Sequence, residues 1–267
     1  MAATPAPKER KNNLLCLDIG NSNVVLGLWE KDQWLAHWRV RTIRDQMPDE
    51  YAVLLKALLR NNGYDFKNIT RVVMASVVPP LTVVFQELFQ RYMGIEPLIV
   101  NSAVKTGLRI CIDNPPELGA DLLADAVAAY HRFRGACIVV DFGTATTFSA
   151  VSKEGDFLGV AIALGLGVAA EALAAHTAQL PRVALVPPPA AIGKNTVHSM
   201  QSGLIFGYVG LVKELLHRIR TELGGAANVI ATGGLSSVLA PLVEEIDAVD
   251  PWLTLDGLRL ISELNKA

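Results

Sequence analysis

The strongest constraint on the fold is a strand-and-turn pattern that the sequence contains twice. Residues 14–25 read LLCLDIGNSNVV and residues 137–148 read CIVVDFGTATTF. In each copy an apolar, β-favouring run ends in Asp-x-Gly and small hydrogen-bonding residues, which predicts a buried strand followed by a tight turn. Asp18 and Asp141 align, half a chain apart. We therefore expect a duplicated domain with one site in the cleft between the two copies.

The two turns have the composition of a phosphate site. Gly20 and Gly143 stand where the backbone turns sharply and comes close to an anion, because a Cβ would obstruct that approach. Asn and Thr side chains offer donors to phosphate oxygens, and an Asp carboxylate holds Mg²⁺ directly or through water. One such turn alone is more often an ordinary hairpin turn. A second copy, together with Thr232-Gly233-Gly234 after a third apolar strand, favours a nucleotide site.

Other nucleotide-binding and catalytic motifs are missing from the sequence. It contains no GxxxxGK[ST], no HExxH and no GxSxG, which argues against P-loop, zinc hydrolase and serine hydrolase chemistry. Residues 165–170 (GLGVAA) resemble a dinucleotide fingerprint but lack the acidic residue about 20 positions later, so we expect these glycines to allow close helix packing instead. Cys16, Cys111 and Cys137 are odd in number and form no CxxC pair, which indicates buried thiols in a reducing compartment.

The composition limits the class of partner. The chain has 267 residues, 51% of them hydrophobic, which is enough for a packed core. A formal net charge of −2 without a basic block indicates no binding to nucleic acid or to an anionic membrane surface, and we interpret Arg39, Arg41 and Arg44 as strand and strand-end residues. The uncharged run at 157–170 is shorter than the ~20 residues of a membrane span. Residues 1–13 are expected to be a disordered tail, not a signal peptide, in a cytoplasmic protein.

The hydrophobic pattern predicts the same order of elements in each half. Strands are expected over residues 14–17, 24–29, 34–42, 71–76, 97–100, 137–140, 146–152, 157–163 and 228–231. Helices are expected from Pro48, Thr82, Gly119, Gly167 and Val197. Three hairpinned strands, then helix, strand and helix, twice over, resemble the layout of the actin and sugar-kinase ATPase superfamily. The expected fold is therefore α/β, with duplicated ribonuclease H-like (actin-like ATPase) domains over residues 14–134 and 135–267, a mixed five-stranded sheet in each, and a nucleotide cleft between them.

A pair of acidic residues marks the start of the helix predicted from Gly119. Asp121 lies in its first turn, and Asp125 follows four residues later on the same face. An acidic residue in the first turn interacts favourably with the helix dipole and stabilises its own helix. It is also placed to act as a general base if a hydroxyl group binds in front of it. The residues alone leave both interpretations open.

The chain resembles the type III pantothenate kinases over residues 14–235. The motifs that carry the resemblance follow one another along this range: DIGNSN at 18–23, Trp38-Arg39 with Thr42, Asp49-Glu50-Tyr51, Asp113-Asn114-Pro115, Gly119-Ala120-Asp121, DFGTATTF at 141–148, NTVHSMQSG at 195–203 and Thr232-Gly233-Gly234. The resemblance implies MgATP-dependent phosphorylation of the hydroxyl group of pantothenate to 4′-phosphopantothenate, the first step of coenzyme A biosynthesis. It also implies a homodimer with the active site at the interface.

The resemblance assigns roles to individual residues. ATP would contact Asp18, Ile19, Gly20, Asn21, Ser22, Asn23, Val24, Val25, Gly143, Thr144, Gly233 and Gly234. Pantothenate would contact Ile112, Gly119, Ala120, Asp121, Leu122 and, across the dimer interface, Thr196. Asp121 would accept the proton of the hydroxyl group as the catalytic base. Asp18 would hold Mg-ATP, and Asp141 would hold a monovalent cation, K⁺ or NH₄⁺.

Four positions depart from the family pattern. Leu122 replaces the Arg that contacts pantothenate in the family, and Ile112 replaces an aromatic residue, usually Tyr. Leu164 stands where Pro is usual, and Ser149 where Asp is usual. The residues expected to bind ATP are kept, so the changes concern mainly the acceptor side. Loss of a hydrogen bond to a charged group costs on the order of 1.5–3 kcal/mol, or roughly ten- to a hundredfold in affinity.

Three hypotheses accommodate these departures. The first is a pantothenate kinase with a refitted acceptor site, in which Arg109 or Arg132 supplies the missing charge. The second is a kinase of the same family that acts on a more apolar hydroxyl acceptor. The third is a regulatory homologue with little turnover, similar to members described as Bvg accessory factors in transcription. Retention of Asp18, Asp121 and Asp141 argues against the third, because facing carboxylates are costly without cations.

Overall fold

Each half of the chain begins with three antiparallel strands, as predicted. The computed structural model describes residues 13–266, and its first three strands form successive hairpins: β1 (Asn13–Ile19), β2 (Asn23–Glu30) and β3 (Gln33–Arg41). The second half repeats the arrangement with β7 (Cys137–Phe142), β8 (Ala145–Val151) and β9 (Asp156–Leu164). The meander predicted for the start of the chain is therefore confirmed, and so is its duplication.

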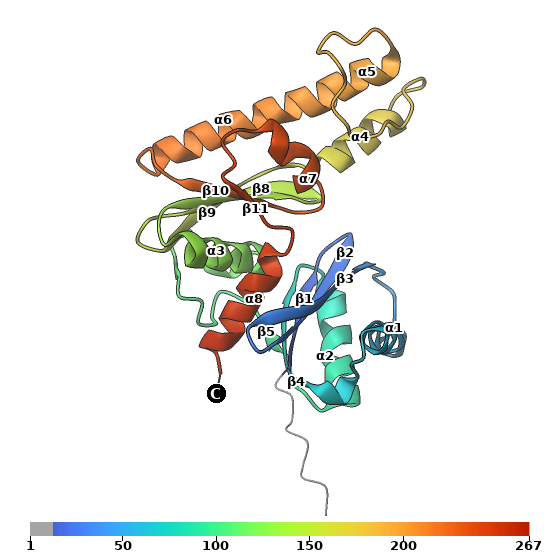
Figure 1. Ribbon diagram of the computed structural model, residues 1–267, viewed down its shortest axis with the longest axis vertical. Helices are drawn as coiled ribbons and strands as arrows, with labels where there is room; N and C mark the ends of the chain where they lie inside the picture. The colour runs from blue at the N-terminus through green and yellow to red at the C-terminus, as the bar shows by residue number, and fades with distance from the viewer. Residues whose placement is uncertain (1–12, 267) are drawn as a thin grey trace, which may run out of the picture.

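The first sheet has the strand order β3-β2-β1-β4-β5. Its last two strands, β4 (Ile69–Ser76) and β5 (Leu98–Ile99), run parallel to β1. Two helices, α1 (Pro48–Asn61) and α2 (Pro79–Met93), cover one face of this sheet, and the short 3₁₀ helix η1 (Phe66–Asn68) leads into β4 (Figure 1). Pro48 begins α1 at the first helical position, where its missing N–H has no helical partner to lose.

The second sheet has six strands instead of the five predicted. Its order is β11-β10-β7-β8-β9-β6, with β10 (Asn228–Thr232) and β11 (Ala248–Val249) parallel to β7. The additional strand at the other edge, β6 (Arg109–Ile110), comes from the first half of the chain and pairs in parallel with β9. A two-residue strand is too short to show a hydrophobic period, so its sequence carries no strand pattern.

Four helices lie on the outer side of the second sheet or extend beyond it: α4 (Leu166–Ala175), α5 (Thr196–Gln201), α6 (Gly207–Glu222) and α7 (Ser236–Leu239) (Figure 1). The helix predicted from Val197 is interrupted, because a π-helical segment, Ser202–Phe206, joins α5 to α6. Short 3₁₀ helices, η2 (Pro115–Glu117) and η4 (Ala240–Leu242), lie in the connections. The arm formed by α4 and α5 therefore projects past the body of the sheet.

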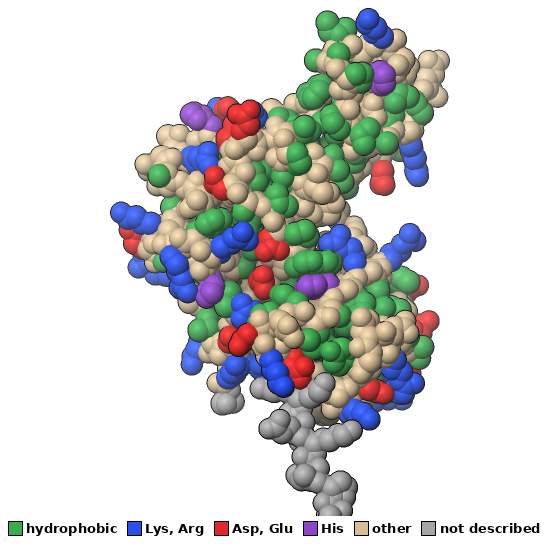
Figure 2. All heavy atoms as spheres, in the orientation of Figure 1, with side chains coloured by type: hydrophobic (Ala, Val, Ile, Leu, Met, Phe, Trp, Pro, Cys, Tyr) green, Lys and Arg blue, Asp and Glu red, His purple; other side chains and the backbone are tan. Residues whose placement is uncertain are grey.

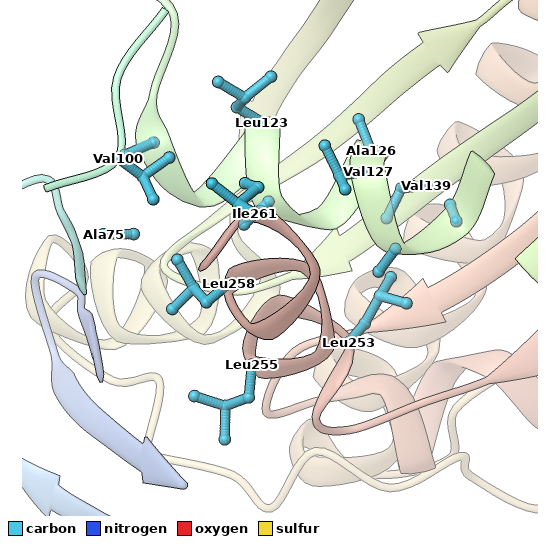
Figure 3. Close-up of a cluster of buried hydrophobic side chains, with 14 of the residues drawn as sticks. Ala75, Val100, Leu123, Ala126, Val127, Val139, Leu253, Leu255, Leu258 and Ile261 are labelled. Atoms are coloured by element: carbon cyan, nitrogen blue, oxygen red, sulfur yellow. The ribbon is translucent and has the colours of Figure 1, made fainter. Parts of the chain in front are cut away.

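Two helices fill the space between the sheets. They are α3 (Ala120–Phe133), from the first half, and α8 (Leu253–Leu264), from the end of the chain. Leu123 of α3 and Leu258 and Ile261 of α8 belong to one buried cluster that also contains Ala75 of β4 and Val139 of β7 (Figure 3). The inner faces of both sheets therefore share a single core. The helix α8 was not predicted, because a glycine in its middle weakens the helical pattern.

The beginning of the chain differs slightly from the expectation. Asn13 is the first residue of β1 and its side chain is buried, so the predicted tail over residues 1–13 extends one residue too far. The rest of that prediction concerns residues 1–12, which lie outside the described residues. The domain boundary expected after residue 134 lies between α3 and β7 and stays a prediction. Within residues 13–266, no helix is long and apolar enough to cross a membrane.

The contact between α3 and α8 depends on a single glycine. A Cβ built on Gly257 would lie 1.9 Å from the carbonyl oxygen of Ala124 and 2.4 Å from its carbonyl carbon. Because both of these atoms belong to the backbone, a larger residue must push the two helices apart. Gly210, in α6, has open space around it and serves as the comparison.

We predict that Gly257→Ala lowers the free energy of unfolding by about 1–3 kcal/mol, since overpacking a core forces backbone shifts. Gly210→Ala should raise it by about 0.5–1 kcal/mol, because Ala loses less backbone entropy in a helix. Urea unfolding of the two variants, followed by circular dichroism, measures both changes. Equal effects of the two substitutions would contradict the tight α3–α8 contact.

Candidate active site

Each sheet with the helices on its outer side forms one lobe of the molecule. A cavity of about 530 Å³ lies between the two lobes. Figure 2 shows the surface hollowed on this side, below the arm that α4 and α5 form. Residues of both repeated turns and of the third glycine turn line the cavity: Asp18, Gly20, Asn21, Ser22, Asn23, Asp141, Gly143, Thr144, Gly233 and Gly234. The cleft that the duplication predicts is therefore present, and the three motifs meet in it.

The period of the strands explains why the two aspartates face each other. In β1, Leu14 and Cys16 point into the core between the sheets, so Asp18, two residues further on, lies on the same inner face. In β7, Cys137 and Val139 do the same, which places Asp141 on its inner face. The residues that alternate with these point outward. Those of β1 enter the core under α1 and α2, and those of β7 enter the core under α6. Both carboxylates thus emerge at the strand ends, towards the cleft.

The two phosphate turns are bonded to each other. The side-chain oxygens of Ser22 and Thr144 lie 2.8 Å apart and share a hydrogen bond across the cleft. In the first turn the N–H of Gly20 donates to the carbonyl oxygen of Asn23 at 3.0 Å. The hydroxyl group of Thr42 donates to the carbonyl oxygen of Gly20 at 2.6 Å, which holds the turn against β3. The donors for a phosphate group are thereby fixed in position before a ligand binds.

Two glycines outside the paired motifs allow close approaches in the site. A Cβ on Gly165 would lie 2.2 Å from the carbonyl oxygen of Thr144, so the start of α4 packs directly on the second turn. The close packing expected of this glycine is real, but its partner is the turn and not another helix. Gly167 has open space around it and lines the cavity. Gly233 has a positive φ of 88°, and a Cβ there would lie 2.2 Å from Oδ1 of Asp141.

Several predicted site residues lie outside the cavity. Ile19 and Val24 are fully buried in the core under α1 and α2, so only their backbone groups remain for a nucleotide, whereas Val25 lines the cavity. Ala120 is buried in the core between the sheets, and Ile112 packs against that core.

Two further predicted residues have distinct positions. Gly119 precedes α3, and a Cβ there would lie 2.6 Å from Oδ1 of Asp121, so its lack of a side chain leaves room for that carboxylate. Thr196 is the first residue of α5 and is exposed on the projecting arm. Within one chain, therefore, Thr196 does not line the cavity.

The carboxylate of Asp121 serves its own helix and also faces the cavity. Its Oδ1 accepts a hydrogen bond from the N–H of Leu122 at 2.8 Å, as expected for an acidic residue in a first helical turn. Asp121 and Leu122 both line the cavity. Burial raises the pKa of Asp121, and the hydrogen bond from Leu122 opposes this rise. The two interpretations left open by the sequence are therefore compatible.

The other carboxylates of the site are also destabilised in their charged form. Burial raises the pKa of Asp18 well above its usual range, and the charges of Asp121 and Asp141 raise it further. Burial, with a contribution from Asp121, raises the pKa of Asp141 to about 7, and Arg39 opposes this rise. Such a group of like charges favours the binding of protons or of cations.

Asp125 is a member of this group that does not reach the cavity surface. It lies one helical turn after Asp121, is only 1% exposed, and its Oδ1 has no hydrogen-bond partner among the described residues. Burial raises the pKa of Asp125 well above its usual range, and the hydrogen bond with Thr254 of α8 lowers it. The sequence placed Asp125 on the same face as Asp121, but its burial and the hydrogen bond with Thr254 depend on α8.

The oxygen groups near Asp18 and Asp141 suit a hard cation. A small chamber of about 60 Å³ adjoins the main cavity and is lined by Asp18, Asp141, Thr232 and Thr254, among others. Carboxylate and hydroxyl oxygens are the ligands that Mg²⁺ and related cations prefer. Within residues 13–266, no three His, Cys, Asp or Glu side chains form a ready metal cage. The arrangement thus resembles sites in which one or two carboxylates and the phosphates of the substrate bind the metal together.

The cations proposed from the sequence to replace the missing Arg lie elsewhere. Arg109 forms a two-point ion pair with Asp156, with distances of 2.7 and 2.6 Å. Arg132 pairs with Asp250 at 3.5 Å, and neither arginine lines the cavity. Among the described residues that line it, Arg39 is the only cationic one, although its place in the sequence indicated only a strand residue.

Comparison with known proteins identifies the family. A family model described as type III pantothenate kinase matches residues 14–218. A type III pantothenate kinase of Moorella thermoacetica is 49% identical over 252 residues, which cover 94% of this chain and 99% of the relative. The chain belongs to the type III pantothenate kinase family. The family resemblance noted in the sequence is therefore confirmed, and the chain is a kinase-family enzyme.

Two solved structures have a similar fold. One is a Campylobacter jejuni protein provisionally described as a conserved Baf family transcriptional activator, with a TM-score of 0.58, 20% identity and coverage of 94% of this chain and 98% of that one. Another is a Sinorhizobium meliloti protein provisionally described as a 2-dehydro-3-deoxygalactonokinase, with a TM-score of 0.55, 16% identity and coverage of 94% and 96%. At these identities the likeness shows the fold alone, which is that of the actin and sugar-kinase ATPases.

We predict that the stability of the ligand-free protein falls as the pH rises from about 4 to about 7. Asp141 has an ordinary pKa of 3.8 and a pKa of about 7 in the folded protein, so between these values the folded state holds a proton that the unfolded state releases. The stability that this bound proton contributes is fully present below about pH 4 and is lost as the pH rises through the folded pKa of Asp141. Asp141→Asn should therefore raise the melting temperature at pH 7.5 more than at pH 5, as calorimetry would measure.

The control for this measurement is Asp32→Asn, in the exposed hairpin between β2 and β3. It removes one carboxylate outside the site and should leave the pH dependence unchanged. A wild-type pH dependence in Asp141→Asn would contradict the assignment of this proton to Asp141.

Proposed function

We propose that the chain phosphorylates pantothenate with MgATP and yields 4′-phosphopantothenate and ADP. The observation that carries this proposal is that Asp121 lines the same cavity as both phosphate turns. A carboxylate beside a phosphate site is the arrangement that phosphoryl transfer to a hydroxyl group requires. The family and its relatives support the same activity. The two other hypotheses, a different acceptor and a regulatory homologue, are less favoured.

The proposed step is an in-line displacement. The hydroxyl oxygen of the acceptor attacks the γ-phosphorus of ATP, the bond from this phosphorus to the bridging oxygen breaks, and ADP leaves with the electron pair. The hydroxyl proton passes to the carboxylate of Asp121, whose raised pKa makes it a better base. Backbone and side-chain donors of the turns at Gly20 and Thr144 hold the phosphates in line. Positioning and charge stabilisation supply most of the catalysis in such reactions.

The carboxylates of the site would hold the cations of the reaction. Asp18 would bind Mg²⁺ together with the nucleotide, and Asp141 would bind a monovalent cation, K⁺ or NH₄⁺. These cations supply positive charge that neutralises the phosphates during transfer. The absence of a side chain on Gly233 leaves room beside the carboxylate of Asp141, which supports this assignment. Without a cation, Asp141 would be partly protonated near neutral pH.

The acceptor side of the cavity is more apolar than in the family pattern, yet it suits pantothenate. The hydroxyl group that is phosphorylated stands next to a carbon with two methyl groups. Leu122 lines the cavity directly beside Asp121, where its apolar side chain would pack against those methyl groups. Ile112 contributes to the core behind this position. The acceptor is therefore oriented by packing next to the base.

We predict that Asp121→Asn lowers turnover by about 10²- to 10⁴-fold and leaves ATP affinity nearly unchanged, because it removes only the base. The measurement is the formation of 4′-phosphopantothenate from MgATP, K⁺ and pantothenate, followed by mass spectrometry. Asp32→Asn, in an exposed hairpin, is the matched control and should keep wild-type turnover. Undiminished turnover in Asp121→Asn would refute the role of this residue, and no product from the wild type would shift support to another acceptor.

We also propose that the chain forms a homodimer in the cytoplasm, through the face that β9 and the α4–α5 arm present. Val160, Ile162 and Leu164 alternate along β9, so they lie on one side of the strand, and all three are exposed. Val197 of α5 is also exposed, next to Thr196. Adjacent exposed apolar side chains are typical of an interface between subunits. A second copy on this face would bring Thr196 towards a neighbouring cavity.

We predict that Ile162→Asp converts the dimer to a monomer, because it places a charge in an apolar interface. Ile162 is 67% exposed in the single chain, and Val83 of α2 is similarly exposed at 64%. Val83→Asp is therefore the matched control and should remain dimeric. Light scattering coupled to size-exclusion chromatography measures the mass of each variant. A monomeric wild type would overturn the proposed interface.

A further inference from the structure

Arg39 stands level with Asp18 on the inner face of the first sheet. Asp18 of β1 pairs with Val25 of β2, and Val25 pairs with Arg39 of β3. Residues directly opposite one another on neighbouring strands point to the same face of a sheet. Since Asp18 and Val25 line the cavity, the register brings Arg39 to the same wall, and Arg39 indeed lines both the cavity and the adjoining small chamber.

The guanidinium group of Arg39 is available to a ligand. Among residues 13–266, no carboxylate oxygen lies within the 4.0 Å of an ion pair from it, although Asp18 and Asp141 line the same space. The side chain is also exposed to solvent through the cavity. An arginine that carries five N–H donors and has no carboxylate partner is suited to bind an anion with two parallel hydrogen bonds.

Contacts with the second lobe hold Arg39 across the cleft. The guanidinium carbon lies 5.7 Å from the centre of the Trp252 ring, and a Cβ on Gly234 would lie 3.6 Å from one of its nitrogens. Trp252 in turn stacks on His37 of the same strand, with ring centres 4.4 Å apart. The arginine therefore begins on the first lobe and ends beside the third glycine turn of the second.

The residues beside Arg39 indicate which anion it meets. Arg39 lines the small chamber together with Asp18, Asp141 and Gly233. Neither Asp121 nor Leu122 lines this chamber. Arg39 is thus on the side of the two phosphate turns and away from the base and the acceptor.

From this position we propose that Arg39 is a further catalytic residue, which contacts the γ-phosphoryl group of the nucleotide during its transfer. This inference rests on the proposed kinase function. The role proposed for Arg39 is distinct from that of the Arg that the family has at position 122, which contacts the acceptor. As the bond to the bridging oxygen breaks, negative charge spreads over the phosphoryl oxygens and the leaving ADP. A guanidinium fixed between the lobes stabilises this charge without reorganisation, as an arginine supplied in cis does in other phosphoryl-transfer enzymes.

Two measurements on Arg39→Gln and Arg39→Lys test the proposal. The first is steady-state turnover with MgATP, K⁺ and pantothenate, where we expect Arg39→Gln to lower kcat by about 10³-fold with little change in the KM for pantothenate. The second is calorimetric titration with Mg-ADP and with the β,γ-imido analogue of ATP. Arg39→Gln should weaken binding of the analogue by roughly ten- to a hundredfold more than binding of ADP. Arg39→Lys keeps the charge but not the two-point geometry and should be intermediate in both.

The control variant is Arg41→Gln. Arg41 is exposed on the same strand, two residues further on, and does not line the cavity, so it should behave as wild type in both measurements. The melting temperatures of all three variants separate a loss of contact from a loss of fold, and Arg39→Lys keeps the test valid if Arg39→Gln is unstable.

The outcomes distinguish this inference from the proposed function. Equal loss of affinity for ADP and for the analogue, or a rise confined to the KM for pantothenate, would overturn the contact with the γ-phosphoryl group while leaving the kinase intact. A selective loss of analogue binding in Arg39→Gln, from a wild type that fails to phosphorylate pantothenate, would support the contact and sink the proposed acceptor.

Discussion

Like charges gathered in one place are the constraint on which this structure depends. Asp18, Asp121 and Asp141 face one cavity, with Asp125 directly behind them, and the fold surrounds them with apolar cores. Such a group is stable only when protons or cations balance it. The glycine turns and the hydrogen bond between Ser22 and Thr144 position the phosphates of a nucleotide, and the chamber beside Asp141 has room for a cation. Nucleotide, cations and carboxylates therefore form one electrostatic unit in which each stabilises the others.

The repeated strand-and-turn pattern predicted most of the structural features that depend on residues close together in the sequence. Period-two alternation and an Asp-x-Gly turn are properties of a few adjacent residues, so the six long hairpin strands and the meeting of Asp18 with Asp141 followed from them. Features that depend on distant pairing were missed. The strand β6 exists only because it lies beside β9, and α8 is specified by its packing on α3 at Gly257.

The same distinction explains the errors about the acceptor site. Arg109 and Arg132 are close in sequence to the motif around Asp121, but each is held by its own carboxylate partner away from the cavity. Arg39 is far from that motif in sequence and reaches the cavity through the register of three strands. A register can be read only once the pairing is known, because a shift of one residue would turn Arg39 to the outer face. Proximity along the chain was therefore a poor guide to charge in the site.

The position of α8 has a consequence for the order in which the protein is made. The inner face of the first sheet, including Leu14 of β1 and Ala75 of β4, is covered by a helix that ends the described chain at Leu253–Leu264. During synthesis at about 5–20 residues per second, the part of this apolar face that α8 covers stays exposed until that helix has emerged from the ribosome. The first sheet is thus covered by a helix that is synthesised after the second sheet, and chains that terminate before α8 expose a surface prone to aggregation.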